Sequence, residues 1–173
     1  MRRLTFFLVL AAVLAPALRA QSPATPSTSA PACPSTASID LLITAMDAAI
    51  SGPANQDRTC FRALFLPDAR LIPIRIGGDD AATPQILTVQ GWIDSVAKNG
   101  ATILAEHQLK VKTETWSHMA HLWSTYETRI DGKIAARGIN SIQAIFDGKQ
   151  WHLIEIVWQA QTTADPVPAQ YLP

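Results

Sequence analysis

AHLWSTYETRIDGKIAARGINSIQAIFDGKQWHLIEIVWQ, residues 120–159, is the stretch that decides the fold of this chain. Apolar and polar residues alternate through it, and Asp-Gly pairs interrupt the alternation at 131–132 and 147–148. Asp-Gly is the pair most typical of a two-residue β-hairpin turn. The pattern therefore predicts an antiparallel meander with strands ending at residue 130 and spanning 133–146 and 150–159. A further strand is expected at 103–115.

Before this meander in the sequence, the apolar residues are spaced three and four positions apart, as on one face of a helix. Ser38 is a suitable N-cap, Gly52-Pro53 a stop signal, and one apolar stripe lies between them: Ile39, Leu42, Ile43, Met46 and Ile50. Shorter helices are expected at 56–65 and 88–98, with a strand at 69–75 between them. Helices followed by a run of strands predict an α+β fold, with three helices on one face of a curved antiparallel sheet.

The first twenty residues have the pattern of a secretory signal peptide: Arg2 and Arg3, an apolar run, then small residues. The run is shorter than the ~20 apolar residues that span a bilayer. We expect cleavage after Ala20, with Ala17 the alternative. A flexible linker rich in Pro, Ser, Thr and Ala is predicted at 21–37, one domain at 38–162 and a tail at 163–173.

Charge and cysteine content narrow the compartment and the partners. The 14 basic and 14 acidic residues cancel, which argues against nucleic acid as a partner. Removing residues 1–20 takes away three arginines and no acid, so the mature chain is mildly acidic, and no later stretch predicts membrane insertion. We expect a periplasmic or secreted protein, in which Cys33 and Cys60 form a disulfide. On the chain-entropy account that bridge contributes roughly 3–4 kcal/mol.

Three motifs carry a resemblance to a known family. They are 64–71 (LFLPDARL), 120–127 (AHLWSTYE) and 137–143 (RGINSIQ), followed by Trp151 and Trp158. In order and spacing they resemble exported bacterial members of the nuclear transport factor 2-like (SnoaL-like, cystatin-like) superfamily. The resemblance implies a cone-shaped sheet wrapped around helices, a pocket between them, and often a homodimer. The superfamily includes isomerases, dehydratases, epoxide hydrolases, polyketide cyclases and binding proteins, and the catalytic sets of its known enzymes do not match residues here.

Hairpin geometry gives a candidate ligand site. If both Asp-Gly pairs close two-residue loops, then Tyr126, Arg137 and Trp158 lie in one row across three strands, with Ser124 beside them on the same face. A guanidinium between two aromatic rings on an apolar face is suited to an anionic or planar ligand. The alternative is an arginine that packs its stem on the rings or pairs with Glu127 or Glu155.

Other polar residues suggest weaker sites. His121 and Glu155 are candidates for acid–base catalysis, although a hydrogen-bonded structural histidine is the preferred interpretation of His121. The four histidines lack the spacing of a metal site, so no metal and no cofactor are expected. Tryptophans on both faces of the sheet predict that the outer face meets a second subunit in a homodimer.

Three functions remain open at this level. The first is an exported domain that binds a small molecule without an identifiable catalytic set. The second is an enzyme of the lyase or isomerase kind, and the third is a protein-interaction module. A cavity of some hundreds of Å³ would favour the first two, and a cavity acid or histidine with a strongly shifted pKa would favour the enzyme.

Overall fold

The computed structural model of the chain describes residues 32–173. The predicted signal peptide and residues 21–31 of the predicted linker lie outside the described residues. The elements are α1 (Ile39–Ile50), β1 (Gly52–Pro53), α2 (Thr59–Ala63), β2 (Phe65–Ile76), β3 (Ala82–Pro84), β4 (Leu87–Thr88), α3 (Val89–Ala97), β5 (Ile103–Trp116), β6 (Met119–Ile130), β7 (Lys133–Phe146), β8 (Trp151–Ala160) and a 3₁₀ turn, η1 (Ala169–Tyr171).

Helix α1 forms as its sequence pattern predicts. The Ser38 hydroxyl accepts a hydrogen bond from the amide of Leu41 at 3.3 Å and so caps the helix. The predicted stripe supplies its buried face, where Leu42 and Met46 are almost fully inaccessible. At the other end, Arg58 is buried and donates to the carbonyls of Ala49 and Ile50, each at 2.6 Å. A buried guanidinium thus bonds carbonyls that have no partner within the helix.

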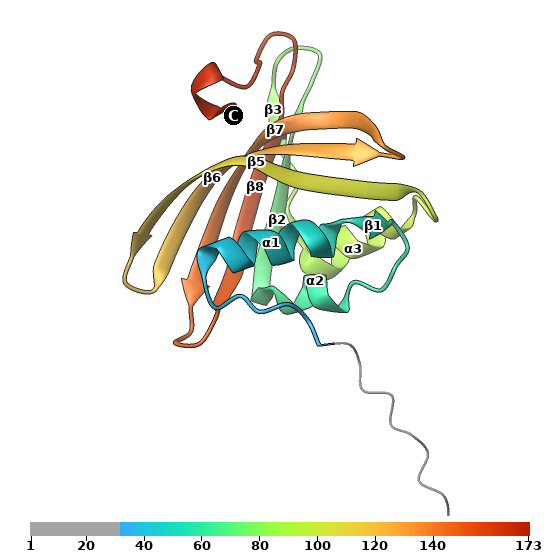
Figure 1. Cartoon of the computed structure of the whole chain (residues 1–173). Coiled ribbons are helices and arrows are strands. Elements are labelled where there is room, and N and C mark those ends of the chain that lie inside the picture. The colour runs from blue at the N-terminus through green and yellow to red at the C-terminus, as the bar shows by residue number, and fades with distance from the viewer. Residues whose placement is uncertain (1–31) are drawn as a thin grey trace, which may run out of the picture. The chain divides into compact units, whose positions relative to one another are not determined.

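The strands form one curved sheet in the order β1-β5-β6-β7-β8-β2-β3, with β4 paired to β2. All three helices lie against one face, here called the inner face, and the C-terminal segment lies over the other, the outer face (Figure 1). The predicted α+β class is confirmed. The sheet is mixed rather than antiparallel, because β2 runs parallel to β8. Phe61, Leu122, Ile142 and Leu153 are among the largest fully buried side chains of the core between helices and sheet.

The first hairpin turn is confirmed, but the register beyond it is not the predicted one. Ile130 pairs with Lys133, and Asp131 and Gly132 both have positive φ. A bulge at Ala135 then shifts the pairing by one residue, so that Glu127 instead of Tyr126 lies opposite Arg137. Bulges of this kind bend and twist a strand, which a strongly curved sheet requires.

The second turn is also different from the predicted one. Phe146 pairs with Trp151, so residues 147–150 form a four-residue loop in place of a two-residue turn. Asp147 Oδ1 closes this loop by accepting from the amides of Lys149 at 2.7 Å and Gln150 at 2.8 Å. These two hydrogen bonds, with a smaller effect of His152, lower the pKa of Asp147 to about 2. The Asp147 carboxylate is therefore occupied by the turn.

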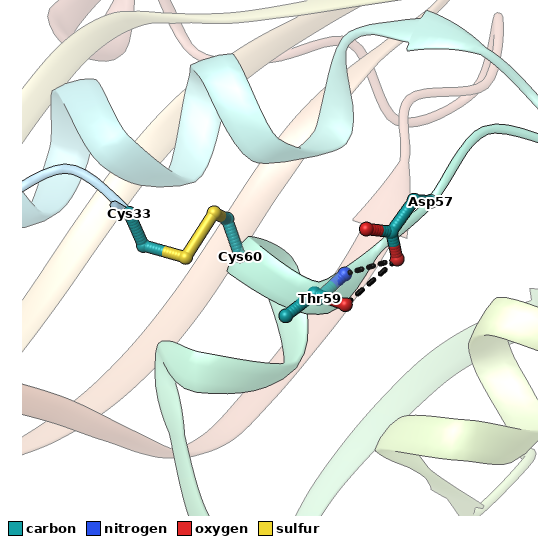
Figure 2. Close-up of a disulfide and its surroundings, with 4 residues drawn as sticks. All are labelled: Cys33, Asp57, Thr59 and Cys60. Atoms are coloured by element: carbon teal, nitrogen blue, oxygen red, sulfur yellow. Dashed lines mark hydrogen bonds between the residues drawn. A yellow bond between two sulfur atoms is a disulfide. The ribbon is translucent and has the colours of Figure 1, made fainter. Parts of the chain in front are cut away.

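The N-terminal part of the described chain is fixed to the domain at two points. Cys33 and Cys60 form the predicted disulfide, which ties the segment before α1 to α2 (Figure 2). Next to it, Asp57 accepts from the Thr59 amide and hydroxyl and stabilises the start of α2. Thr36 is buried, and its carbonyl accepts from the Trp151 amide at 2.8 Å. In the part of the chain that the structure describes, no helix has the length and apolar character needed to cross a membrane.

Candidate functional site

A cavity of about 390 Å³ lies between the helices and the inner face of the sheet. This volume is within the range of small-molecule sites. Its walls are mostly apolar and come from α1, α2, α3, β2 and β8: Met46, Ile50, Phe61, Leu71, Trp92, Ile156 and Trp158. Four polar side chains on β5, β6 and β7 also line it: Glu106, Tyr126, Thr128 and Asn140. We call this space the inner cavity.

Glu106 is the acid of the inner cavity. It lies on β5 opposite Thr128, whose hydroxyl donates to Oε2 at 2.8 Å, while Gln108 Nε2 donates to Oε1 at 3.4 Å. Burial disfavours the charged carboxylate and, with the nearby charge of Asp47, raises the pKa of Glu106 to about 7. A carboxyl with this pKa can both accept and donate a proton near neutral pH.

Tyr126 supplies a phenol to the same cavity. Its ring is buried, and burial followed by the neighbouring Glu106 raises its pKa, so it stays protonated at neutral pH. A Cβ placed on Gly138 would lie 2.8 Å from the Tyr126 hydroxyl and 2.0 Å from the carbonyl oxygen of Gln159. Glycine at position 138 therefore makes room for the phenol. Within residues 32–173 the hydroxyl has no hydrogen-bond partner, so it is available to a ligand.

A polar network supports these groups from behind. Gln108 Oε1 accepts from the Ser124 hydroxyl at 2.5 Å and from Asn140 Nδ2 at 3.1 Å. Gln108 Nε2 donates to Asp47 on α1 at 3.2 Å as well as to Glu106. Buried polar groups with complete hydrogen bonds hold one arrangement of side chains. The acid of the cavity is thus part of an ordered cluster.

The predicted row of Tyr126, Arg137 and Trp158 does not form. Tyr126 lies opposite Gly138, and Trp158 lies opposite Asn140. The bulge at Ala135 turns Arg137 to the outer face, where its Nε donates to Glu127 Oε2 at 2.7 Å. This hydrogen bond, with a smaller contribution from Arg129, lowers the pKa of Glu127. The sequence offered an alternative, in which Arg137 forms an ion pair with Glu127. The structure contains this ion pair.

The other predicted ligand residues stay on the inner side. Tyr126 and Trp158 line the inner cavity, whereas Ser124 is fully buried outside its lining and donates to Gln108. Trp158 keeps the predicted face because two one-residue shifts cancel, the bulge at Ala135 and a second bulge at Ile154 on β8. The four-residue loop shifts the pairing by two residues and so leaves the face unchanged. A direct role of any of these residues in ligand binding remains a prediction.

The two predicted catalytic candidates lie away from the inner cavity. His121 is on the outer face, where its Nε2 is 3.2 Å from the Ser141 hydroxyl. Glu155 is on the same face and pairs with Arg70 at 3.0 Å. His121 and Glu155 both pair with Gln143, from opposite sides, so roughly 10 Å of sheet separates their backbones. The arrangement offers no contact between the imidazole and this carboxylate.

Glu106, Gln108 and Asp47 were missed at the level of sequence. The predicted catalytic candidates, His121 and Glu155, both lie in the strands after residue 115. Alternation on β5 does place Glu106 and Gln108 on one face. The bulge after Gln108 interrupts this alternation. A period-two pattern read along the whole strand therefore does not place Glu106 and Gln108 on the same face as the inward-facing residues after the bulge.

A second and larger hollow lies on the outer face. It has a volume of about 700 Å³ and is bounded by the sheet and the C-terminal segment, including Trp123, Val157, Pro166 and Val167. The segment is held down where Thr125 donates to the Tyr171 carbonyl at 2.5 Å. Asp165 is the one charged residue of residues 32–173 in its lining. In the described residues, no group of three or more His, Cys, Asp or Glu side chains is placed to hold a metal ion.

Comparisons with known proteins place this geometry in a fold. No family model matches the chain, and no curated protein matches it significantly. Among solved structures, the beta subunit of a proposed aromatic-ring-hydroxylating dioxygenase from Novosphingobium aromaticivorans superposes with a TM-score of 0.56 at 15% identity, covering 73% of this chain and 89% of that one. A nuclear transport factor 2-like protein of unknown function from Shewanella baltica gives 0.50 at 12% identity, covering 72% and 92%.

The domain has the nuclear transport factor 2-like fold. The resemblance seen in the sequence motifs is confirmed at the level of the fold. A proposed scytalone dehydratase from N. aromaticivorans has a TM-score of 0.53 at 11% identity, covering 78% of this chain and 89% of that one. Such low identities carry the fold alone, and nuclear transport factor 2-like domains serve unrelated functions. Function therefore has to be argued from the inner cavity.

Proposed function

We propose that this protein binds a neutral, partly apolar small molecule in the inner cavity and transfers a proton on it, with Glu106 as acid and base. The observation that carries the proposal is the Glu106 carboxyl, which lines an unfilled apolar cavity beside the Tyr126 phenol. The nearly neutral pKa of Glu106 favours an enzyme over a purely binding protein. The open volume argues against a domain that serves only to dock another protein.

The lining of the inner cavity also indicates the charge of the ligand. No lysine, arginine or histidine of residues 32–173 lines it. An anionic ligand would have to leave water without a cationic partner and would lie beside an acid, which is unfavourable. Arg137, on which an anionic ligand was predicted, is on the outer face. A neutral ligand is therefore favoured, and the stacked rings of Phe61 and Trp92 offer it a flat apolar wall.

The chemistry that suits these groups is removal of a proton next to a carbonyl group. The C–H bond breaks, its proton passes to the Glu106 carboxylate, and the electron pair moves to the carbonyl oxygen. The Tyr126 hydroxyl donates a hydrogen bond to that oxygen as charge develops on it. Return of the proton to another carbon gives isomerisation, and loss of a β-hydroxyl group gives dehydration. The likeness to a proposed scytalone dehydratase agrees with the second outcome.

Proton exchange on a simple ketone tests the proposal. With 2-tetralone in D₂O at pD 7, we expect the protein to accelerate exchange of the protons next to the carbonyl, followed by NMR. Glu106→Gln should reduce the protein-catalysed rate about 100-fold, and Tyr126→Phe should reduce it with little change in tetralone affinity. Glu114→Gln, at an exposed position paired with Lys112, is the matched control. Equal exchange with Glu106→Gln, or tighter binding of 2-naphthoate than of 2-tetralone, would contradict the proposal.

We also infer that the chain is exported. The support is the signal-like pattern of residues 1–20 together with the Cys33–Cys60 disulfide, since stable disulfides form in oxidising compartments. Mass spectrometry of the protein from a periplasmic or secreted fraction should show loss of residues 1–20 or 1–17. A full-length protein in the cytosol would contradict export.

A further inference from the structure

The network behind the inner cavity joins two acids through one amide group. Gln108 Nε2 donates to Asp47 Oδ1 at 3.2 Å and to Glu106 Oε1 at 3.4 Å. The orientation of this amide is fixed on its other side, where Oε1 accepts from Ser124 and Asn140. The bulge that follows Gln108 on β5 ends the regular pairing at this residue. Bulges near functional sites commonly set the direction of a side chain.

The two acids are not bonded equally. Asp47 accepts two hydrogen bonds from Gln108, one from Nε2 and one from the backbone amide at 3.1 Å. Glu106 accepts the longer of the two hydrogen bonds from Gln108 Nε2. It also accepts one hydrogen bond from the Thr128 hydroxyl. Donors to a carboxylate favour its charged form. When Asp47 is ionised, its negative charge opposes ionisation of Glu106.

We propose that Asp47 is a positioning residue that keeps a proton on Glu106 near neutral pH, and that Gln108 holds the two carboxyls in this relation. The proposal rests on the proposed function for its use, because a carboxyl that loses and regains its proton near pH 7 can accept a proton from the ligand and then return it. Neither Asp47 nor Gln108 lines the cavity. Asp47 reaches the ligand through Glu106, and Gln108 through Glu106 and Asn140.

Other groups near the pair have to be considered. From β6, Tyr126 lies close enough to Glu106 for the carboxyl to raise the pKa of the phenol. From β5, His107 Nδ1 is 4.0 Å from Asp47 Oδ2, and a protonated imidazole there would lower the pKa of Asp47. Burial has the largest effect and raises the pKa of Asp47, against the hydrogen bonds from Gln108 and this smaller effect of His107. In residues 32–173 no lysine or arginine forms a salt bridge with either acid.

The test follows the carboxyl carbons of Asp47 and Glu106 by ¹³C NMR from pH 3 to 9. Asp47→Asn keeps the shape of the side chain and removes its charge, so the pKa of Glu106 should fall by about one unit. Gln108→Met removes one donor to Asp47, so the pKa of Asp47 should rise. His107→Gln separates titration of the imidazole from that of the acids, and Glu114→Gln should change neither carboxyl.

The proposal is overturned if Asp47→Asn leaves the Glu106 titration unchanged or moves it upward. Should Asp47→Asn or Gln108→Met fail to fold, the unmodified protein still decides. Two coupled acids sense each other, so the Asp47 carbon should show a second, smaller step at the pH where Glu106 titrates. A single step for each carbon would refute the coupling. These measurements read protonation and not turnover, so a coupled pair without tetralone exchange would reject the proposed function and keep this inference.

Discussion

Replacing Glu106 by glutamine should change how the stability of the domain depends on pH. In the folded chain the pKa of Glu106 is raised from 4.5 to about 7. Between pH 4.5 and pH 7, Glu106 is ionised in the unfolded chain and protonated in the folded chain. Unfolding then releases a proton, so stability falls as pH rises through this window. The stability associated with the neutral carboxyl is complete below pH 4.5 and is lost above pH 7.

The size of the effect follows from the same shift. A displacement of about 2.5 units at 1.36 kcal/mol per unit corresponds to about 3 kcal/mol. Glu106→Gln removes the titration, and its amide can still accept a hydrogen bond from Thr128. The full effect is reached only between pH values below 4.5 and above 7. From pH 5 to pH 8, the stability of the variant relative to that of the unmodified protein should therefore rise by about 2.5 kcal/mol.

Urea unfolding at pH 5, 6, 7 and 8, followed by tryptophan fluorescence with the disulfide intact, gives this difference directly. The lowered pKa values of Glu127 and Asp147 affect stability mainly below pH 4.5, outside the window, and they act in the opposite direction. Groups shared by the two proteins, Asp47 included, largely cancel in the comparison. Glu114→Gln should follow the unmodified protein at every pH. A gap between Glu106→Gln and the unmodified protein that does not grow from pH 5 to pH 8 would refute the assignment of Glu106 as a neutral cavity acid.

Three further predictions concern the support of the cavity. Gly138→Ala should strongly lower the urea midpoint of unfolding, because its Cβ would lie 2.0 Å from the Gln159 carbonyl oxygen. Gly78→Ala is the control, since its Cβ would meet no atom within 4 Å. Equal midpoints for the two variants would show that the strands can shift to make room. The double change Cys33→Ser and Cys60→Ser should cost roughly 3 kcal/mol of unfolding free energy, and a loss below about 1 kcal/mol would show that the bridge constrains little. Arg58→Met should cost at least about 2 kcal/mol, since it leaves the carbonyls of Ala49 and Ile50 without this donor, and calorimetry showing an unchanged Tm would contradict that role.

A homodimer formed through the outer face stays a prediction. The C-terminal segment covers part of that face, where Val167 is buried and Lys110 Nζ donates to the Leu172 carbonyl at 2.8 Å. The segment thus occupies surface that a second subunit was expected to cover. Sedimentation equilibrium of the mature protein distinguishes the two arrangements. A monomer at all concentrations would contradict the homodimer.

Local sequence determined α1, α3, the four long strands β5 to β8 and the first turn. The helix expected at 56–65 is shorter, at Thr59–Ala63, because β2 already begins at Phe65. Ser38 and the apolar stripe that follows it specify α1, and Asp131-Gly132 specifies the hairpin between β6 and β7. Each of these signals depends on residues within a few positions of one another. Hydrogen bonds of caps and turns form between such neighbours, so composition and spacing are enough to locate them.

The candidate site was decided by the tertiary structure. Bulges at Ala135 and after Gln108 respond to the curvature of the whole sheet, and a one-residue shift moves a side chain from one face to the other. That shift took Arg137 out of the site. Asp47 and Glu106 are far apart in the sequence and come together only because α1 packs on β5. Their shifted protonation depends on burial, and burial exists only once helices and sheet enclose the cavity.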